Sequence, residues 1–147
     1  EEQERYVKRC LFYGVLPSNQ AAPSGGWYWA DPMVVDRHRP VFAKYVHVIV
    51  DVAEAGWEPQ TLARTSDPQV WIERFGSGSV FYLTVFNPDS VRRKAEVVLD
   101  ERCSLGTNGS VRDVLRKRTV KLKRSGKQVS FEVELGQEDV GVFRVRK

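Results

Sequence analysis

The sequence predicts a mainly β protein: an antiparallel β-sandwich of about seven or eight strands with Greek-key-like connections, preceded by one strand, a long loop and one helix. From about residue 60 onward, apolar and polar residues alternate in short runs. Turn signals such as Asn87-Pro88-Asp89 and Ser125-Gly126 separate these runs. Before residue 60 the pattern differs, because a continuous apolar run and a segment with helical spacing flank a stretch rich in Pro, Ser and Gly.

The N-terminal region is expected to form a charged helix end, a strand and a long loop. Residues 1–9 are mostly charged and indicate the end of a helix. The run Cys10–Leu16, CLFYGVL, shows no polar alternation, which is typical of a parallel strand buried on both faces. Pro17–Val35 contains Pro, Ser, Gly and Asn and is therefore expected to be a loop.

A helix is expected from Asp36 to Ala55. Asp36 is placed to act as its N-cap, and Pro40 is tolerable in a first turn. Gly56 is placed to terminate the helix in a left-handed conformation. Apolar residues recur at helical spacing, at Phe42, Tyr45, Val46, Ile49, Val52 and Ala53.

The remaining residues are expected to form the strands of the sandwich. The alternating runs are TLARTS, VWIERFG, SVFYLTVFN, RKAEVVLD, VRDVLRKR, TVKLKR, KQVSFEVEL and DVGVFRVRK. A two-residue turn at Ser125-Gly126 is expected to set the register of the basic hairpin that it closes. The predicted cross-strand pairs are Val120 with Phe131, Leu122 with Val129, Lys117 with Glu134 and Thr119 with Glu132.

Charge is unevenly distributed along the 147 residues. Residues 1–66 carry 7 basic and 8 acidic side chains, a net charge of −1, whereas residues 67–147 carry 16 basic and 11 acidic, a net charge of +5. This asymmetry coincides with the change in hydrophobic pattern. We therefore expect two units, residues 1–59 and residues 60–147.

Several classes of protein are disfavoured by what the sequence lacks. No apolar run approaches the roughly 18 residues that span a bilayer, and the charged first ten residues contain no signal-peptide core. Two Cys and two His, far apart, do not form a metal-ligand cluster, and no phosphate-loop or dinucleotide fingerprint is present. We expect no metal, no cofactor and no membrane partner, with Cys10 and Cys103 as buried thiols; the sequence does not indicate a compartment.

The basic stretch Val111–Arg124 has two interpretations. Seven Arg and Lys residues suggest a phosphate-binding strip. The stretch lacks interleaved exposed aromatic residues, however, and its charges have acidic partners across the predicted hairpin. We therefore expect no nucleic-acid partner.

The chain offers no convincing catalytic constellation. Hydrolysis of a glycosidic bond requires two carboxyl groups that face one bond, but the loop supplies Asp31 alone, and Asp36 is expected to cap the helix. No Gly-x-Ser-x-Gly pattern supports a serine hydrolase. Catalytic residues are therefore expected to be absent from this chain.

The loop sequence GGWYWADP carries the candidate binding residues Trp27, Tyr28, Trp29 and Asp31. The flat aromatic rings suit the apolar faces of sugar rings, and the carboxylate can accept hydrogen bonds from hydroxyl groups. The loop follows the expected strand, at the end where α/β folds bind ligands. The alternative is that the rings anchor a long loop against the body of the protein, and the sequence leaves both possibilities open.

The order of the segments resembles the C-terminal portion of TIM-barrel glycoside hydrolases. The resemblance rests on the helix ending DVAEAGWEPQTLART, on VWIERFG followed by VFYLTVFNP, and on VRDVL and EDVGVFRVRK. It implies that Leu11–Val15 is the last strand of a (β/α)8 barrel, Pro17–Val35 its loop on the active-site face, and Asp36–Ala55 its last helix. Residues 60–147 would be the all-β domain that packs on the barrel.

The resemblance also implies a function. The parent protein is expected to be a glycoside hydrolase whose nucleophile and general acid lie on earlier barrel strands, so that this chain alone is inactive. Its partners would be a carbohydrate substrate and the catalytic barrel, with Trp57 and Trp71 at the inter-domain contact. The alternative is a stand-alone β-sandwich module that binds carbohydrate or protein.

Overall fold

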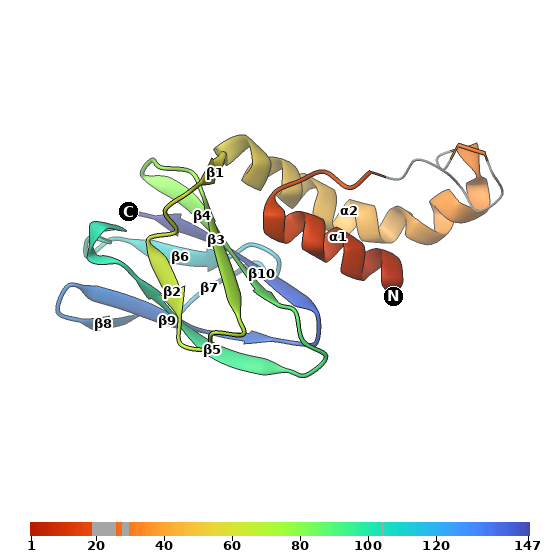
Figure 1. The fold of residues 1–147 in the computed structure, drawn as a ribbon. Helices are drawn as coiled ribbons and strands as arrows, with labels where there is room; N and C mark the ends of the chain where they lie inside the picture. Colours follow the sequence, from red (N-terminus) through yellow and green to blue (C-terminus); the bar gives the residue numbers. More distant parts are fainter. Residues whose placement is uncertain (19–25, 28–29, 104) are drawn as a thin grey trace.

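The computed structural model describes all residues except 19–25, 28–29 and 104. The described residues form two helices, α1 (Glu2–Tyr13) and α2 (Pro32–Ala55), followed by ten strands and a short 3₁₀ helix at Glu101–Cys103. The strands build a sandwich, and the two helices lie side by side against it (Figure 1).

The sandwich consists of two antiparallel sheets. The larger sheet has the strand order β1 (Trp57–Glu58), β3 (Trp71–Phe75), β4 (Val80–Asn87), β10 (Asp139–Arg146), β6 (Ser110–Asp113) and β7 (Arg118–Thr119). The smaller sheet has the order β2 (Ala63–Thr65), β5 (Arg93–Leu99), β9 (Gln128–Leu135) and β8 (Lys123–Ser125). The predicted antiparallel β-sandwich is confirmed, and the strands beyond the expected eight are the two-residue β1 and β7.

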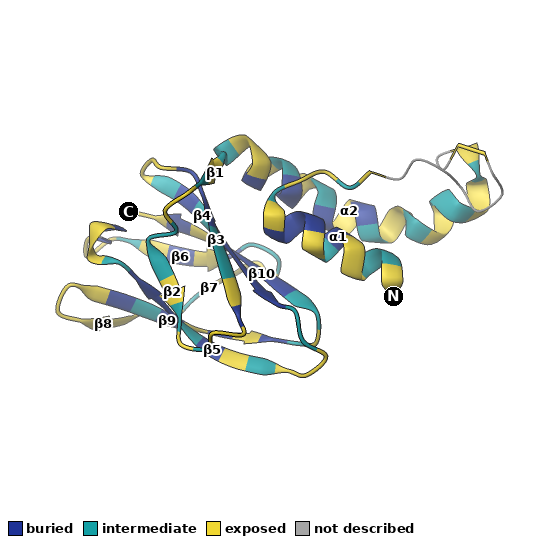
Figure 2. Cartoon of the chain, viewed as in Figure 1, coloured by how far each residue is buried: buried dark blue, intermediate teal, exposed yellow. Residues whose placement is uncertain are grey.

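Alternation of apolar residues builds the core between the sheets. In β9, Val129, Phe131 and Val133 are buried and point toward the larger sheet, while the residues between them lie nearer the solvent. β4 differs, because almost all of its residues after Tyr82 are buried. The cause is a second core on its other face, where the helices cover it (Figure 2).

The helices attach to the outer face of the larger sheet through α1. The ring of Phe12 lies 5.4 Å from that of Phe86, measured between centroids, and the hydroxyl of Thr84 donates a hydrogen bond of 2.8 Å to the carbonyl of Phe12. Gly14 ends the helix with a φ of 62°. A Cβ atom at this position would lie 2.5 Å from the ring of Phe75, so only glycine allows the helix end to sit this close to the sheet.

The predicted strand at Cys10–Leu16, and with it the barrel strand at Leu11–Val15, is wrong, because α1 continues to Tyr13. A buried parallel strand needs hydrogen-bonding neighbours, and every strand pair among the described residues is antiparallel and lies in the sandwich. A helix satisfies its backbone internally. Its apolar stripe of Val7, Cys10 and Leu11, at helical spacing, is then buried against α2 and the sheet.

The predicted N-cap at Asp36 is also wrong, because α2 begins at Pro32. The carboxylate of Asp31 accepts hydrogen bonds from the backbone N–H of Met33, at 3.0 Å, and of Val34, at 3.4 Å. A proline is favoured in the first helical turn, so Asp31-Pro32 makes the better start, and Pro40 lies inside the helix. Gly56 ends α2 as expected with a positive φ of 83°, although its ψ of 133° lies outside the left-handed helical region.

The predicted register of the basic hairpin is wrong by two residues. Arg124 lies opposite Val129, so the turn is formed by Gly126 and Lys127, with Gly126 supplying a φ of 58°. The strand also divides: Thr119 pairs with Arg112 in the larger sheet, while residues 123–125 pair with β9. Thr119 and Lys117 are therefore not the cross-strand partners of Glu132 and Glu134. The division of the chain at residue 59 stays a prediction, although β1 already places Trp57 in the larger sheet.

Candidate functional site

The predicted binding loop is described only in part. Trp27 is 80% exposed, while Tyr28 and Trp29 lie outside the described residues. Asp31 is partly buried and its carboxylate caps α2, a structural role that the sequence analysis assigned to Asp36. The part of the loop that the structure describes thus presents one open aromatic ring directly before a helix N-terminus.

The first turns of α2 extend past α1 and away from the sandwich (Figure 1). Within α2, the buried residues begin at Phe42, so residues 32–41 contain none. Met33 is 84% exposed, and Val34 and Val35 are only partly buried. A helical segment that is surrounded by solvent normally carries polar residues on all sides. The apolar residues at the start of α2 therefore indicate a surface that another domain or protein covers.

An apolar groove follows the face of α2 that carries Val35, whereas Met33, two residues earlier, points to another side of the helix. Its volume is about 490 Å³, and it is lined by Leu16, Pro17, Val35, Arg39, Phe42, Ala43 and Val46. Leu16, which is 60% exposed, contributes from the segment that follows α1. This segment is held in place because the Tyr6 hydroxyl donates to the carbonyl of Ser18, at 3.1 Å, and accepts from its N–H, at 3.0 Å.

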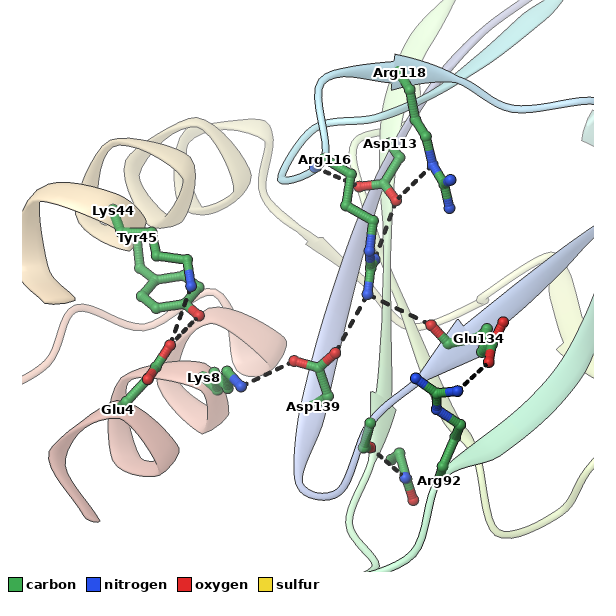
Figure 3. Close-up of polar contacts among 12 residues, drawn as sticks. Glu4, Lys8, Lys44, Tyr45, Arg92, Asp113, Arg116, Arg118, Glu134 and Asp139 are labelled. Atoms are coloured by element: carbon green, nitrogen blue, oxygen red, sulfur yellow. Dashed lines mark hydrogen bonds and ion pairs between the residues drawn. The ribbon is translucent and has the colours of Figure 1, made fainter. Parts of the chain in front are cut away.

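A chain of charged groups fixes α1 to the sandwich (Figure 3). Lys8 on α1 contacts the carboxylate of Asp139 at 2.9 Å, and the other oxygen of Asp139 lies 3.3 Å from the guanidinium of Arg116. Arg116 also pairs with Asp113 at 3.1 Å, and the side chain of Asp113 is only 2% exposed. The buried carboxylate is thus neutralised, and the chain of contacts aligns the helices with β10.

This cluster was not predicted, although the strand VRDVL carries a signal for part of it. Val111 and Asp113 alternate onto the same buried face of β6. An aspartate at a core-facing position requires a cationic partner, and Arg116 follows three residues later. The local sequence does not indicate the other two members of the cluster, Lys8 of α1 and Asp139 of β10.

The two helices are joined by Glu4, Tyr45 and Lys44. The buried Tyr45 hydroxyl donates a 2.7 Å hydrogen bond to Glu4, and the Lys44 ammonium lies 3.1 Å from the same oxygen. The hydrogen bond from Tyr45 is the main cause that lowers the pKa of Glu4, while burial and the Glu4 carboxylate raise the pKa of Tyr45. These groups hold α1 against α2, with the Tyr45 ring buried between the helices and the Lys44 ammonium at the surface.

Cys10 and Cys103 are both buried and unpaired, as expected. Burial raises the pKa of each thiol, which keeps it protonated and unreactive at neutral pH. Among the described residues, no three His, Cys, Asp or Glu side chains are grouped so that they could hold a metal ion. Neither described helix is long and apolar enough to cross a membrane.

Comparison with known proteins identifies the fold. No protein-family model matches the chain, and no curated protein matches it in sequence. Among solved structures, it is similar to a β-L-arabinopyranosidase of Geobacillus stearothermophilus, with a TM-score of 0.52 at 15% identity, covering 100% of this chain and 31% of that one. An α-galactosidase I of Mortierella vinacea gives a TM-score of 0.52 at 10% identity, covering 97% and 35%. A maltogenic α-amylase of Thermotoga neapolitana gives 0.53 at 13% identity, covering 98% and 37%.

The comparisons agree on which part of a larger architecture this chain matches. The chain spans about a third of the length of the glycoside hydrolase structures that it matches. The match extends over the helices as well as the sandwich, because nearly the whole chain is covered. The fold of this chain is that of the C-terminal β domain of glycoside hydrolases, together with the helices that precede it.

Proposed function

We propose that this chain is the C-terminal part of a glycoside hydrolase that acts on carbohydrate, and that it supports a catalytic barrel and forms part of the wall of the substrate site. The observation that carries the proposal is the uncovered apolar groove on α2. Burial of apolar surface is the main driving force for the packing of one domain on another. The occupant of this face is the barrel of the same polypeptide.

The length of the matched structures supports this occupant. About two thirds of each matched glycoside hydrolase has no counterpart in this chain, which leaves room for a barrel. The described helices form a layer between the sandwich and the open groove. In this arrangement, α1 and α2 face the barrel on one side and the larger sheet on the other.

The loop before α2 forms the substrate wall in this proposal. Trp27 presents an open ring in the segment just before α2, and Asp31 anchors this segment to α2. Tyr28 and Trp29 remain candidate binding residues from the sequence. Replacement of Trp27 by Ala in the longer protein is expected to raise the KM for a glycoside at least several-fold while the melting temperature stays within about 1 °C, because an 80% exposed ring contributes little to stability.

The catalytic carboxylates are supplied by the barrel in this proposal. A glycoside hydrolase requires two carboxyl groups that face one bond. In the described part of the chain, Asp31 caps a helix, and Asp113 and Asp139 are held by cations between the helices and the sandwich. In this proposal the chain contributes binding and support, and the barrel contributes the reacting groups.

A matched pair of substitutions tests the docking surface. Ala43 and Ala53 are both exposed on α2, ten residues or about 15 Å apart, but only Ala43 lines the groove. Ala43→Asp is expected to weaken association of this chain with the separately produced preceding part of its reading frame at least tenfold, because the contact removes water from the new carboxylate and the nearby Arg39 is already paired with Asp36. Ala53→Asp is expected to leave the affinity unchanged.

The affinities are measured by calorimetric titration, with circular dichroism to show that both variants fold. Equal affinities for Ala43→Asp and wild type would place the contact elsewhere and contradict the proposal. A wild-type chain that is a stable monomer and binds no preceding segment would instead favour a stand-alone binding module.

A further inference from the structure

The outer face of the larger sheet carries a second aromatic surface, at its β1–β3 edge. It consists of Tyr13, Trp57, Trp71 and Glu73, which we call the edge patch. Trp71, Glu73 and Phe75 alternate onto one face of β3, and Trp57 lies opposite Phe75 in the β1–β3 ladder. Phe12 of α1 contacts Trp71, so this is the face on which the helices sit.

The rings of the edge patch are fixed in position and still open to solvent. The indole N–H of Trp57 donates a 2.8 Å hydrogen bond to Glu73, and Trp57 is 60% exposed. Trp71 packs one side against Phe12 and Phe86, with centroids 6.3 Å and 6.1 Å away, and is 45% exposed. Tyr13 packs on Phe12 and is 51% exposed. Rings that are already ordered lose little conformational entropy when they bind a ligand.

The carboxylate between the rings decides which kind of ligand fits. Glu73 is partly buried, and its one polar contact given by the described residues is the neutral indole of Trp57. A dry apolar partner would remove water from this carboxylate and offer no compensating charge, which is costly. A ligand with hydroxyl groups could instead stack on the rings and donate hydrogen bonds to Glu73.

The geometry points to a binding site for a neutral oligosaccharide at the edge patch. The C–H face of a pyranose ring is apolar and packs on an aromatic ring, while its hydroxyls donate to the carboxylate. Trp71 and Phe75, the residue opposite Trp57, are four positions apart along β3, which corresponds to about 13 Å. A chain of several sugars is therefore needed to contact both tryptophans, and acidic sugars are repelled by Glu73.

The edge patch is distinct from the groove on α2. Trp57 follows the C-terminal end of α2, whereas the groove residue nearest to it in sequence, Val46, is eleven positions earlier, about 16 Å along the helix. The oligosaccharide site therefore does not depend on whether the groove receives a barrel, and the two proposals are tested separately.

Binding is tested on the 147-residue chain by following the indole N–H signals of its tryptophans in nuclear magnetic resonance spectra. The neutral probes are the hexasaccharides of β-linked glucose, mannose, xylose and galactose, and the acidic probe is an oligogalacturonate. At least one neutral probe is expected to shift the Trp57 and Trp71 signals in the same saturable manner. The oligogalacturonate is expected to bind at least tenfold more weakly.

Variants separate binding from folding. Trp71→Ala is expected to weaken binding at least tenfold, whereas Trp71→Phe keeps a ring against Phe12 and Phe86 and weakens it less. Lys127→Ala, at an exposed position in the β8–β9 turn of the smaller sheet, is the control and is expected to leave the affinity unchanged. Glu73→Gln retains an acceptor for the Trp57 indole and is expected to bind the acidic probe better than wild type does.

The proposal is overturned if none of the neutral probes shifts the Trp57 and Trp71 signals at 10 mM. It is equally overturned if both rings become inaccessible to acrylamide quenching in the longer protein. That second result would assign the edge patch to the inter-domain contact that the sequence analysis expected for Trp57 and Trp71.

Discussion

At the scale of single residues, one glycine controls how closely the helices approach the sandwich. Gly14 has a positive φ, and a Cβ atom there would overlap the ring of Phe75 at 2.5 Å. Gly126 has a similar φ of 58°, but a Cβ atom there would meet nothing within 4 Å. An alanine at either position would therefore suffer the same backbone strain, but only an alanine at position 14 would also clash with a neighbouring side chain.

Gly14→Ala is expected to lower the free energy of unfolding by about 3 kcal/mol, the sum of the left-handed backbone penalty and overpacking. Gly126→Ala is expected to cost about 1 kcal/mol, because the backbone penalty alone applies. Urea unfolding measures both values. Equal losses for the two variants would show that the α1 terminus does not rest on Phe75.

The Glu4–Tyr45 hydrogen bond makes the stability of the packed helices α1 and α2 depend on pH. The pKa of Glu4 is lowered below its ordinary value of 4.5 in the folded chain, first by the Tyr45 hydroxyl. A lowered folded pKa gives stability that is present above the unfolded pKa and is lost as the pH falls through the folded pKa.

Tyr45→Phe is expected to destabilise the protein by about 1 kcal/mol at pH 7, because a hydrogen bond to a partly exposed carboxylate is lost. The difference from wild type is expected to shrink as the pH falls below 4.5. Tyr6→Phe is the control, because the Tyr6 hydroxyl bonds to the backbone of Ser18, and its cost should not vary over this range. Urea unfolding between pH 3 and pH 7 measures both variants, and parallel profiles for the two would contradict the assignment.

At the scale of elements, local patterns predict most strands of the sandwich. They fail where contacts with distant segments determine the secondary structure or the strand pairing. The alternating runs and turn signals predict eight of the strands, because half-buried strands impose a period of two. The run Cys10–Leu16 taken alone has no periodicity, and the helical spacing of α1 appears only when Val7 is included. The packing of Phe12 against the sheet, which also holds α1 in place, is not contained in the local sequence. The observed register of the basic hairpin differs by two residues from the predicted one, because Thr119 pairs with β6 in the larger sheet and not with β9.

The binding loop also has some features that the local sequence predicts and others that depend on tertiary contacts. The aromatic residues are conspicuous in the sequence, and Trp27 is open as a binding role requires. The cap was assigned to Asp36 because the apolar spacing is clear only after it, whereas Asp31-Pro32 is the stronger start signal. The groove on α2 could not be predicted, because it is formed by side chains from two segments whose contact is tertiary.

Phe12 is expected to be the main anchor between α1 and the larger sheet, since it is 2% exposed and contacts both Phe86 and Trp71. Phe12→Ala is expected to cost about 3–4 kcal/mol. Hydrogen exchange in α1 should accelerate strongly while exchange in β9 changes little. Tyr13→Ala removes a neighbouring ring that is 51% exposed and should cost less than about 1 kcal/mol. Unchanged protection of α1 in Phe12→Ala would show that the ion pairs alone hold the helix.

At the scale of the whole molecule, a complete sandwich is joined to an incompletely covered helical layer. The sandwich closes its own core, with large residues such as Phe81 and Phe131 fully buried. The helices bury one side on the sheet and leave a groove and the start of α2 open on the other. The fold matches about a third of larger glycoside hydrolases, and the open groove is the surface that the proposed supporting role requires.

The most direct test of the proposed role is hydrolysis of a panel of nitrophenyl glycosides by three samples: the 147-residue chain, the preceding part of its reading frame, and both together. We predict no turnover by the chain alone and at least a tenfold increase when it is added to the preceding part, because it completes the fold and the substrate wall. Turnover by the chain alone, or full activity of the preceding part without it, would contradict the proposed role.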